Sequence, residues 1–313
     1  MQRLENAIAA HGGFTSPFVD CQERMESFFA DVFYELSSSK TDEARRVFIE
    51  LVRMYNRVLA STTNWVAANT RLASLGRLLR AEIAGGQPVT LITFNQDLVA
   101  ENAVYRLPRR HGARCLSCIY GRPPIEKMGS PSPLFPWTPQ CDHTFPVQLF
   151  KLHGSLNWFT RTRDEFPSAG ALFPSANKEV FALLDGQIRL EGFQKSRNQS
   201  GRTVWHLWPL VIPPIYDKHR LTGTPVIGHQ WLGATQAIVH ADRLVAWGYS
   251  LPDADVTSAQ MLRRAIRDNG GLDSIHVINP DHHLVGRVKD KLGVPVVHQY
   301  DSAEHYLKHR VDA

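Results

Sequence analysis

The chain has few cysteines, no long apolar run and no large excess of charge. Four cysteines in 313 residues are too few for a disulfide framework, which indicates a reducing compartment. No apolar run approaches the roughly 20 residues of a membrane-spanning helix, and the N-terminus has neither a basic segment nor a long apolar stretch. We therefore expect a cytoplasmic protein with no membrane partner.

Charge and hydrophobicity are those of an ordinary globular protein. A formal net charge of +5, spread along the chain, suits an anionic small molecule or a nucleic acid without requiring either. With 43% hydrophobic residues the chain can bury a large core. We expect a single α/β domain over residues 1–313.

Hydrophobic periodicity divides the chain into a helical part and a mixed part. Apolar residues spaced by three and four predict a helical N-terminal region over about 20–86. From Val89 onward the pattern changes to short β-branched and aromatic runs that predict strands. These runs are VTLITF, VQLFKL, RLVAWG, SIHVIN and VPVVHQ.

The predicted strands are apolar on both faces, which is typical of a parallel sheet covered by helices on both sides. The last third shows the alternation most clearly, with helices expected over about 254–268, over about 283–292 and near Glu304. We therefore predict a Rossmann-like parallel sheet flanked by helices.

Two polar segments interrupt this pattern, at about 105–146 and 160–203. Both predict a long loop or a small subdomain inserted over one face, and loops of this length are uncommon unless they carry function. The first begins with a cluster of arginines that suits a solvated loop, a dinucleotide phosphate or a nucleic acid. Its members are Arg106, Arg109, Arg110 and Arg114.

Compact polar residues follow four of the predicted strands, and ligands of open α/β sheets bind at the carboxyl ends of strands. Each set also has a structural alternative, because Asn95 could cap a helix, Gly154 could permit a turn and Asn279 could begin one. Four such sets in one chain favour a binding site. They are Asn95, Gln96 and Asp97; His153, Gly154 and Ser155; Gly248, Tyr249 and Ser250; and Asn279, Pro280 and Asp281.

Five motifs occur in a fixed order: TFNQD (93–97), KLHGS (151–155), VIPPIYDK (211–218), WGYSLPDAD (247–255) and VINPD (277–281). Together they resemble the bacterial sirtuin-like domains that hydrolyse NAD in antiphage defence. The resemblance spans about 89–281, and its specificity comes from the order of the motifs rather than from any one of them. It implies NAD+ as substrate, cleaved at the nicotinamide glycosidic bond to give nicotinamide and ADP-ribose or a cyclised form.

The resemblance also implies roles for individual residues. Asn95 matches the asparagine that holds the ribose and the attacking water, and His153 matches the histidine general base. The positions that line the dinucleotide would be Thr93, Phe94, Asp97, Gly154, Ser155, Gly248, Tyr249, Ser250, Asp255 and Asn279.

The chemistry of NAD cleavage suits an amide and an imidazole. Nicotinamide leaves as a neutral molecule through an oxocarbenium-like transition state, so positioning matters more than acid catalysis. The amide of Asn95 can donate and accept hydrogen bonds at once. A neutral imidazole at His153 can take a proton near pH 7, typically worth about 10²- to 10⁴-fold, and we expect Gly154 to leave room for substrate beside it.

The glycine-rich loop that cradles the pyrophosphate in this family has no clear counterpart. The nearest candidate, Gly12-Gly13-Phe14-Thr15-Ser16, follows a segment that reads as helix and lacks the Gly-Ala-Gly order. A first βα unit is missing from the chain, the phosphate is held differently, or the domain does not hydrolyse NAD. A noncatalytic module that binds NAD or ADP-ribose is therefore an alternative.

The cysteines offer a possible structural zinc site. Cys115 and Cys118 form a CxxC, and Cys141 with His143 forms a CxH, so the four could bind zinc tetrahedrally or remain unliganded. Protein-deacylating sirtuins place a four-cysteine zinc module after the His-Gly motif. No cysteine follows Cys141, which argues against a protein deacylase.

The resemblance to defence effectors implies an activity that is held off until it is triggered. Because the chain ends shortly after the last predicted βα unit, we expect control by assembly into a homo-oligomer or by a separate sensor or ATPase partner. Nucleic acid would then act only indirectly. A nucleic-acid-associated scaffold that uses the arginine cluster is the other alternative, and it predicts binding that weakens steeply with salt.

Overall fold

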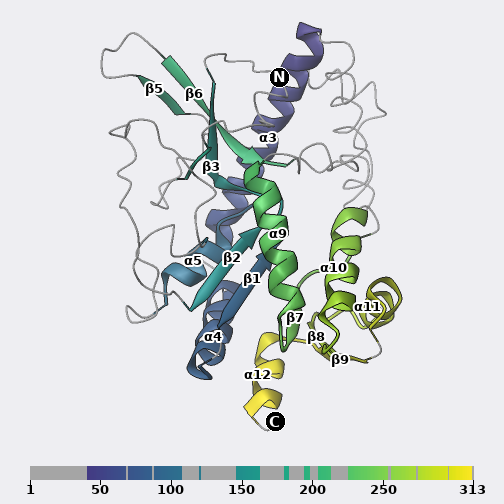
Figure 1. The fold of residues 1–313 in the computed structure, drawn as a ribbon. Coiled ribbons are helices and arrows are strands. Elements are labelled where there is room, and N and C mark those ends of the chain that lie inside the picture. Colours follow the sequence, from purple (N-terminus) through teal and green to yellow (C-terminus); the bar gives the residue numbers. More distant parts are fainter. Residues whose placement is uncertain are drawn as a thin grey trace.

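The computed structural model shows a mixed α/β protein (Figure 1). It describes residues 41–67, 70–86, 88–107, 120, 146–162, 180–182, 194–197, 204–212, 225–252, 255–272, 274–294 and 296–311.

Two parallel sheets form the centre of the fold. In the first, β1 (Val89–Thr93) pairs with β2 (Val147–Lys151), from Val89 opposite Val147 to Thr93 opposite Lys151. The second has the order β7-β8-β9, with strands β7 (Leu244–Trp247), β8 (Ser274–Ile278) and β9 (Val296–Tyr300). The parallel strands predicted from the short apolar runs are confirmed.

Helices alternate with these strands as the sequence predicts. The helical N-terminal region is confirmed where the structure describes it, and its part before residue 41 lies outside the described residues. The helices are α3 (Asp42–Ala67), α4 (Thr70–Ala84), α5 (Val99–Tyr105), α9 (Pro225–Val239), α10 (Val256–Asn269), α11 (Leu284–Leu292) and α12 (Ala303–Val311).

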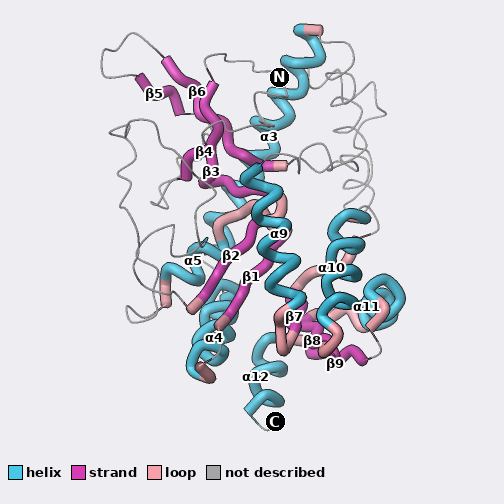
Figure 2. Tube along the Cα trace, viewed as in Figure 1, coloured by secondary structure: helices cyan, strands magenta, loops and turns pink. Residues whose placement is uncertain are grey.

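The side chains of β1 and β2 alternate between two hydrophobic cores, which explains why these strands are apolar on both faces. Leu91 and Leu149 join the core that contains α4 and α5 residues, whereas Phe150 packs with Ala234 of α9. Figure 2 shows α9 lying along β2. At Gly233 of α9 a Cβ would overlap the Phe150 ring, so glycine allows this close approach.

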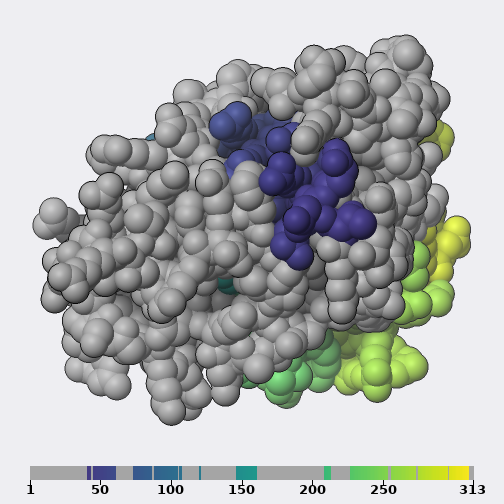
Figure 3. All heavy atoms as spheres, turned by 90° about the horizontal axis from the view of Figure 1, so that it is seen from above, coloured from purple at the N-terminus to yellow at the C-terminus, as the bar shows by residue number. Residues whose placement is uncertain are grey.

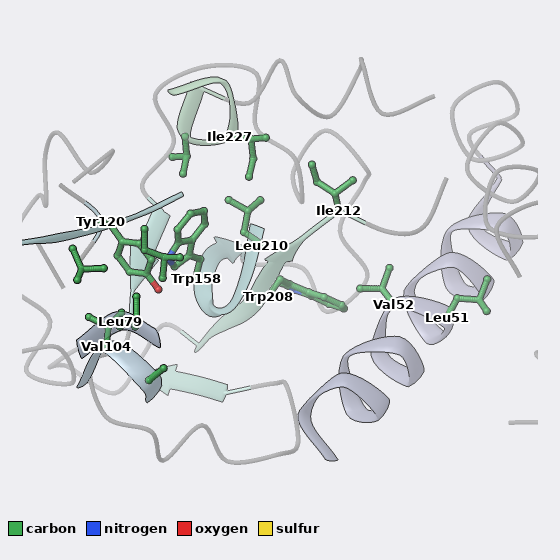
Figure 4. Packing of buried hydrophobic residues seen from close by; sticks show 14 of the residues in the cluster. Leu51, Val52, Leu79, Val104, Tyr120, Trp158, Trp208, Leu210, Ile212 and Ile227 are labelled. Atoms are coloured by element: carbon green, nitrogen blue, oxygen red, sulfur yellow. The ribbon is translucent and has the colours of Figure 1, made fainter. Parts of the chain in front are cut away.

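The largest core holds two of the tryptophans. Trp158 and Trp208 are 2% and 0% exposed, and Figure 4 shows Trp158 beside Tyr120. The rings of Trp158 and Tyr120 meet edge to face, with centroids 5.2 Å apart. Packing in the core, rather than stacking on a ligand base, is therefore the role of these two tryptophans.

A four-stranded antiparallel sheet, in the order β4-β3-β6-β5, follows β2 directly. The sequence predicts only a loop or small subdomain over 160–203, whereas β3 runs through 154–162 and two further strands lie inside the segment. One of them, Gln194–Arg197, is polar in sequence, and the other, Val180–Ala182, is only three residues long. The sheet is composed of β3 (Gly154–Thr162), β4 (Val180–Ala182), β5 (Gln194–Arg197) and β6 (Val204–Val211).

Among the described residues, no helix has both the length and the apolar character needed to cross a bilayer. Figure 3 shows α3, in purple, reaching the surface, and Val58 of this helix is 56% exposed.

Candidate functional site

An aromatic contact joins the ends of the two parallel sheets. Phe94 follows β1 and Tyr249 follows β7, and their rings stack with centroids 4.4 Å apart and an interplanar angle of 17°. His153, which follows β2, also contacts Phe94, with a centroid distance of 5.6 Å and an interplanar angle of 57°. The carboxyl ends of β1, β2 and β7 therefore lie together, and we call this region the carboxyl edge.

His153 occupies the short turn between β2 and β3. Its side chain is 7% exposed, and its carbonyl accepts a hydrogen bond from the backbone N–H of Ile212 at 2.9 Å. The Trp231 ring of α9 lies 6.3 Å away, and its Nε1 donates to the carbonyl of Leu152 at 2.8 Å. Sequence reasoning missed Trp231, because it lies inside a helix and follows no strand.

Asn95 is exposed at the end of β1. Its backbone N–H donates to Oγ1 of Thr93 at 3.1 Å, which shapes the turn that leaves the strand. Helix α5 begins only at Val99, whose N–H donates to Oδ1 of Asp97 at 3.0 Å. The side chain that accepts a hydrogen bond at the start of α5 is therefore the carboxylate of Asp97 and not the amide of Asn95. The predicted ligand-lining residue Asp97 thus has a structural role.

Gln96 anchors the loop between Asn95 and Asp97. It is 5% exposed, its Oε1 accepts from the Tyr55 hydroxyl at 2.7 Å, and its Nε2 donates to the Ile212 carbonyl. Ile212 in turn donates to the carbonyl of His153. Gln96 therefore links the loop that carries Asn95 to the turn that carries His153, a role with no signal in the sequence beyond its place after a strand.

A buried ion pair between β2 and α5 contacts the loop that follows β1. Lys151 Nζ lies 2.9 Å from Oε1 of Glu101, with side chains 0% and 9% exposed, and it also donates to the carbonyl of Asp97. The hydroxyls of Ser155 and Tyr120 donate to the same carboxylate oxygen at 3.0 and 2.8 Å. Burial first, and Glu101 second, raise the pKa of Tyr120 well above its usual value. The hydroxyl of Ser155, predicted to line the dinucleotide, instead faces this buried network.

Glycine is needed at position 154 because another strand approaches closely. The residue has a φ of +81°, and a Cβ there would overlap the carbonyl oxygen of Leu210 and lie 2.9 Å from its carbonyl carbon. The expectation that Gly154 leaves room for substrate is therefore wrong, since the backbone of β6 fills that space. Gly248 differs, because its φ is +67° but nothing lies within 4 Å of the Cβ position.

Tyr249 is oriented by a buried carboxylate. Its hydroxyl donates to Oδ2 of Asp255 at 3.1 Å, and the Ser258 hydroxyl donates to Oδ1 at 2.7 Å. Asp255 is 6% exposed. Burial, followed by the charge of Asp255, raises the pKa of Tyr249, so this hydroxyl remains a donor. Asp255, predicted to line the ligand, holds the Tyr249 ring in its stacked position.

The remaining predicted residues lie after β7 and β8. Asn279 Oδ1 accepts from the N–H of Asp281 at 2.9 Å, so the structural alternative of a turn initiator is correct for this side chain. Ser250 is exposed, and its carbonyl accepts from Nη1 of Arg287 at 2.9 Å. The β7 loop is thus held by a cation from α11.

Several sequence predictions lie outside the described residues. Within the residues that are described, no group of three or more histidine, cysteine or acidic side chains is placed to hold a metal ion. Outside them lie the zinc candidates, the Gly12–Ser16 segment, most of VIPPIYDK and most of the arginine cluster: Cys115, Cys118, Cys141, His143, residues 12–16, residues 213–218, Arg109, Arg110 and Arg114.

The carboxyl edge combines an aromatic pair, an imidazole and an exposed amide. Such a set can stack on a flat heteroaromatic ring, accept a proton and fix a hydroxyl group or a water. Neither protein-family models nor curated protein sequences match this chain. A function must therefore be argued from the residues themselves.

Proposed function

We propose that the chain is an NAD+ hydrolase that cleaves the nicotinamide glycosidic bond in a Rossmann-like domain. The observation that carries the proposal is the arrangement around Phe94, whose ring contacts both His153 and Tyr249. Asn95, the next residue along the chain, is exposed at the end of the same strand. An imidazole and an amide thus come together at the strand ends where open α/β sheets bind ligands.

The reaction needs one water and one base. The oxygen of water forms a bond to C1′ of the nicotinamide ribose while the bond from C1′ to the ring nitrogen breaks. The electron pair of that bond neutralises the pyridinium, so nicotinamide leaves uncharged. The neutral imidazole of His153 accepts the proton of the attacking water, and Asn95 holds the water or a ribose hydroxyl in line. The products are ADP-ribose, nicotinamide and a proton.

The test is release of nicotinamide from NAD+ by the purified protein, followed by chromatography. We expect His153→Ala and Asn95→Ala each to lower the rate, with about 10²- to 10⁴-fold expected for loss of the base. His229→Ala is the matched control, because His229 is an exposed histidine inside helix α9 rather than after a strand. Full activity in both site variants, or no release at high protein concentration with candidate partners present, would overturn the proposal.

Control of this activity forms a second part of the proposal. An enzyme that depletes NAD+ must be inactive until triggered, so we propose that assembly of the chain with itself or with a separate sensor or ATPase partner activates it. Nicotinamide release that rises more steeply than protein concentration would support self-assembly. A rate strictly proportional to concentration, unchanged by such partners, would contradict this part alone.

A noncatalytic NAD- or ADP-ribose-binding module is the second candidate, favoured by the small exposure of His153. A base that is 7% exposed has limited access to substrate. This candidate predicts stabilisation by ligand without turnover, about 2.7 kcal/mol when ADP-ribose is present at 100 times its Kd. A raised melting temperature together with no nicotinamide release would decide for it.

A further inference from the structure

Aspartates stand at the starts of three helices that follow parallel strands at the carboxyl edge. Asp97 Oδ1 accepts from the N–H of Val99 at α5, and Asp281 Oδ1 accepts from the N–H of His283 at α11, both at 3.0 Å. Asp255 directly precedes α10 and is 6% exposed. A carboxylate offsets the partial positive charge of a helix N-terminus. A phosphate placed at any of these three helix starts would therefore meet a like charge.

Among the described residues, a phosphate bound at this edge would therefore need a side-chain cation as its partner. Lys151 is not available, because it is fully buried and paired with Glu101. Arg287 is available, since it is partly exposed and reaches the carbonyl of Ser250 with Nη1 at 2.9 Å. Within the described part of the chain this is the one hydrogen bond of the guanidinium, and a guanidinium has five N–H donors. The remaining donors suit the bidentate recognition of phosphate.

The loop beside Arg287 is open at Gly248 and has an unusual backbone conformation at Leu251. Among the described residues, no atom lies within 4 Å of the Cβ position of Gly248, and Leu251 adopts a left-handed φ of 50°. Lys291 Nζ donates to the carbonyl of Leu251 at 2.9 Å, so two cations one turn apart on α11 hold this loop in place. The loop also carries Tyr249, whose ring stacks on Phe94.

We propose that Arg287 binds a phosphate group of a nucleoside diphosphate, such as ADP-ribose, at the carboxyl edge. This inference rests on the proposed function for its ligand class. It assigns to an arginine on α11 the phosphate contact that the three helix starts do not offer, because an aspartate lies at each of them.

The experiment is calorimetric titration of the full-length protein with ADP-ribose. We expect Arg287→Gln to weaken binding about 10- to 100-fold, the range for losing a hydrogen bond to a charged group. Arg263→Gln is the matched control, because Arg263 on α10 likewise donates to a backbone carbonyl, that of Asp290 at 3.1 Å. Arg287→Lys, which keeps the charge but not the fork, should fall between wild type and Arg287→Gln.

Two further probes separate phosphate binding from positioning of the loop. Adenosine has no phosphate, so its affinity should be the same in wild type and in Arg287→Gln. Inorganic pyrophosphate shows whether the phosphate is recognised alone or only as part of a nucleotide. Whichever phosphate-bearing ligand binds the wild-type protein, Arg287→Gln must lower the affinity for it. An equal loss for adenosine and ADP-ribose would show that Arg287 only shapes the loop, and would overturn the inference.

The outcomes distinguish this inference from the proposed hydrolase. Binding of ADP-ribose that depends on Arg287, without any nicotinamide release, supports the phosphate contact and removes the hydrolase. Nicotinamide release combined with unchanged ADP-ribose affinity in Arg287→Gln removes the phosphate contact and keeps the hydrolase. Absence of ADP-ribose binding to the wild-type protein overturns the inference directly.

Discussion

The two sides of the carboxyl edge are built differently. On the β1–β2 side, polar groups are buried and bonded to one another, as in the Lys151–Glu101 pair and in the Gln96 side chain. On the β7–β8 side, the loop residues Gly248 and Ser250 are exposed, and the loop is held through its carbonyls by cations of a neighbouring helix.

This contrast indicates that the β1–β2 side of the carboxyl edge is rigid and that the exposed loop of the β7–β8 side can adapt. A buried, paired polar group loses its water and holds its geometry only if every partner is present. The hydrogen bond from Arg287 to the Ser250 carbonyl is exposed and exchanges with water at little cost. The β1–β2 side, which carries Asn95 and His153, is therefore expected to hold its geometry, and the β7–β8 side to adjust to a ligand.

The largest effect should come from breaking the buried ion pair. We expect Glu101→Ala to lower the free energy of unfolding by about 3–5 kcal/mol, because it leaves the charge of Lys151 buried without its carboxylate. Glu304→Ala is the control, since it breaks the exposed pair with Arg77 between α4 and α12 and should cost about 0–1 kcal/mol. Similar losses for both variants in urea titrations would show that the β1–β2 side is not specially rigid.

Gly154 and Gly248, two glycines with a left-handed φ, one on each side of the carboxyl edge, provide the next test. Gly154→Ala should lower the free energy of unfolding by roughly 3 kcal/mol, from about 1 for the left-handed φ and about 2 for the overlap with Leu210. Gly248→Ala has only the first of these costs, because its Cβ position is open, and should lose about 1 kcal/mol. Thermal unfolding measures both, and an equal loss would contradict the close approach of β6 to Gly154.

The tyrosine hydroxyls sharpen the comparison further. Tyr249→Phe removes a donor from the buried Asp255 carboxylate and should lower the free energy of unfolding by about 2 kcal/mol, as for hydrogen bonds to charged groups. Tyr55→Phe removes a donor from the neutral amide of Gln96 and should cost about 1 kcal/mol. Denaturant unfolding measures both losses of unfolding free energy. A larger loss for Tyr55→Phe than for Tyr249→Phe would show that the bond to Asp255 does not hold Tyr249 in place.

The smallest effect concerns the pH dependence of stability and two neighbouring histidines of the β7-β8-β9 sheet, His276 of β8 and His298 of β9. His276 is half-buried, stacks on His298 with centroids 5.1 Å apart and contacts Tyr300 and Tyr306. Burial first, then His298 and Arg243, lower the pKa of His276. The unfolded chain therefore binds this proton first as the pH falls below about 6.5, and stability decreases from there until the folded protein is also protonated.

Unfolding measured between pH 8 and pH 5 checks this dependence. His276→Gln should make the curve shallower, whereas His229→Gln, at an exposed site on α9, should leave it unchanged. If the His276→Gln curve is identical to that of the wild type, His276 is not the cause of the loss of stability at low pH.

Much of the fold was predictable where the pattern is local. The alternation of β7, α10, β8, α11, β9 and α12 follows from apolar runs and helical spacing, and the structure places these elements within about two residues of the predicted bounds. The antiparallel sheet was not predictable in this way. β5 reads Gln-Lys-Ser-Arg and has no apolar run, so only its pairing with β6 makes it a strand.

The candidate site was predictable only in part. The sequence placed His153 and Tyr249 at strand ends, because the residue after a strand is a local feature. The sequence predicted ligand contacts equally for Asp97, Ser155, Asp255 and Asn279. In the structure their side chains make hydrogen bonds within the protein. The sequence assigned no role to Gln96 and did not find Trp231. Which side a polar residue faces depends on partners far along the chain.

By itself, therefore, the sequence determined the order of strands and helices and the set of residues that stand at the strand ends, since both depend on spacing between near neighbours. Only the tertiary structure decided which of those residues meet. The Phe94–Tyr249 stack, the Glu101–Lys151 pair and the approach of Leu210 to Gly154 each join segments far apart in the chain. Such contacts form only when separate elements pack into one core, and no local pattern encodes them.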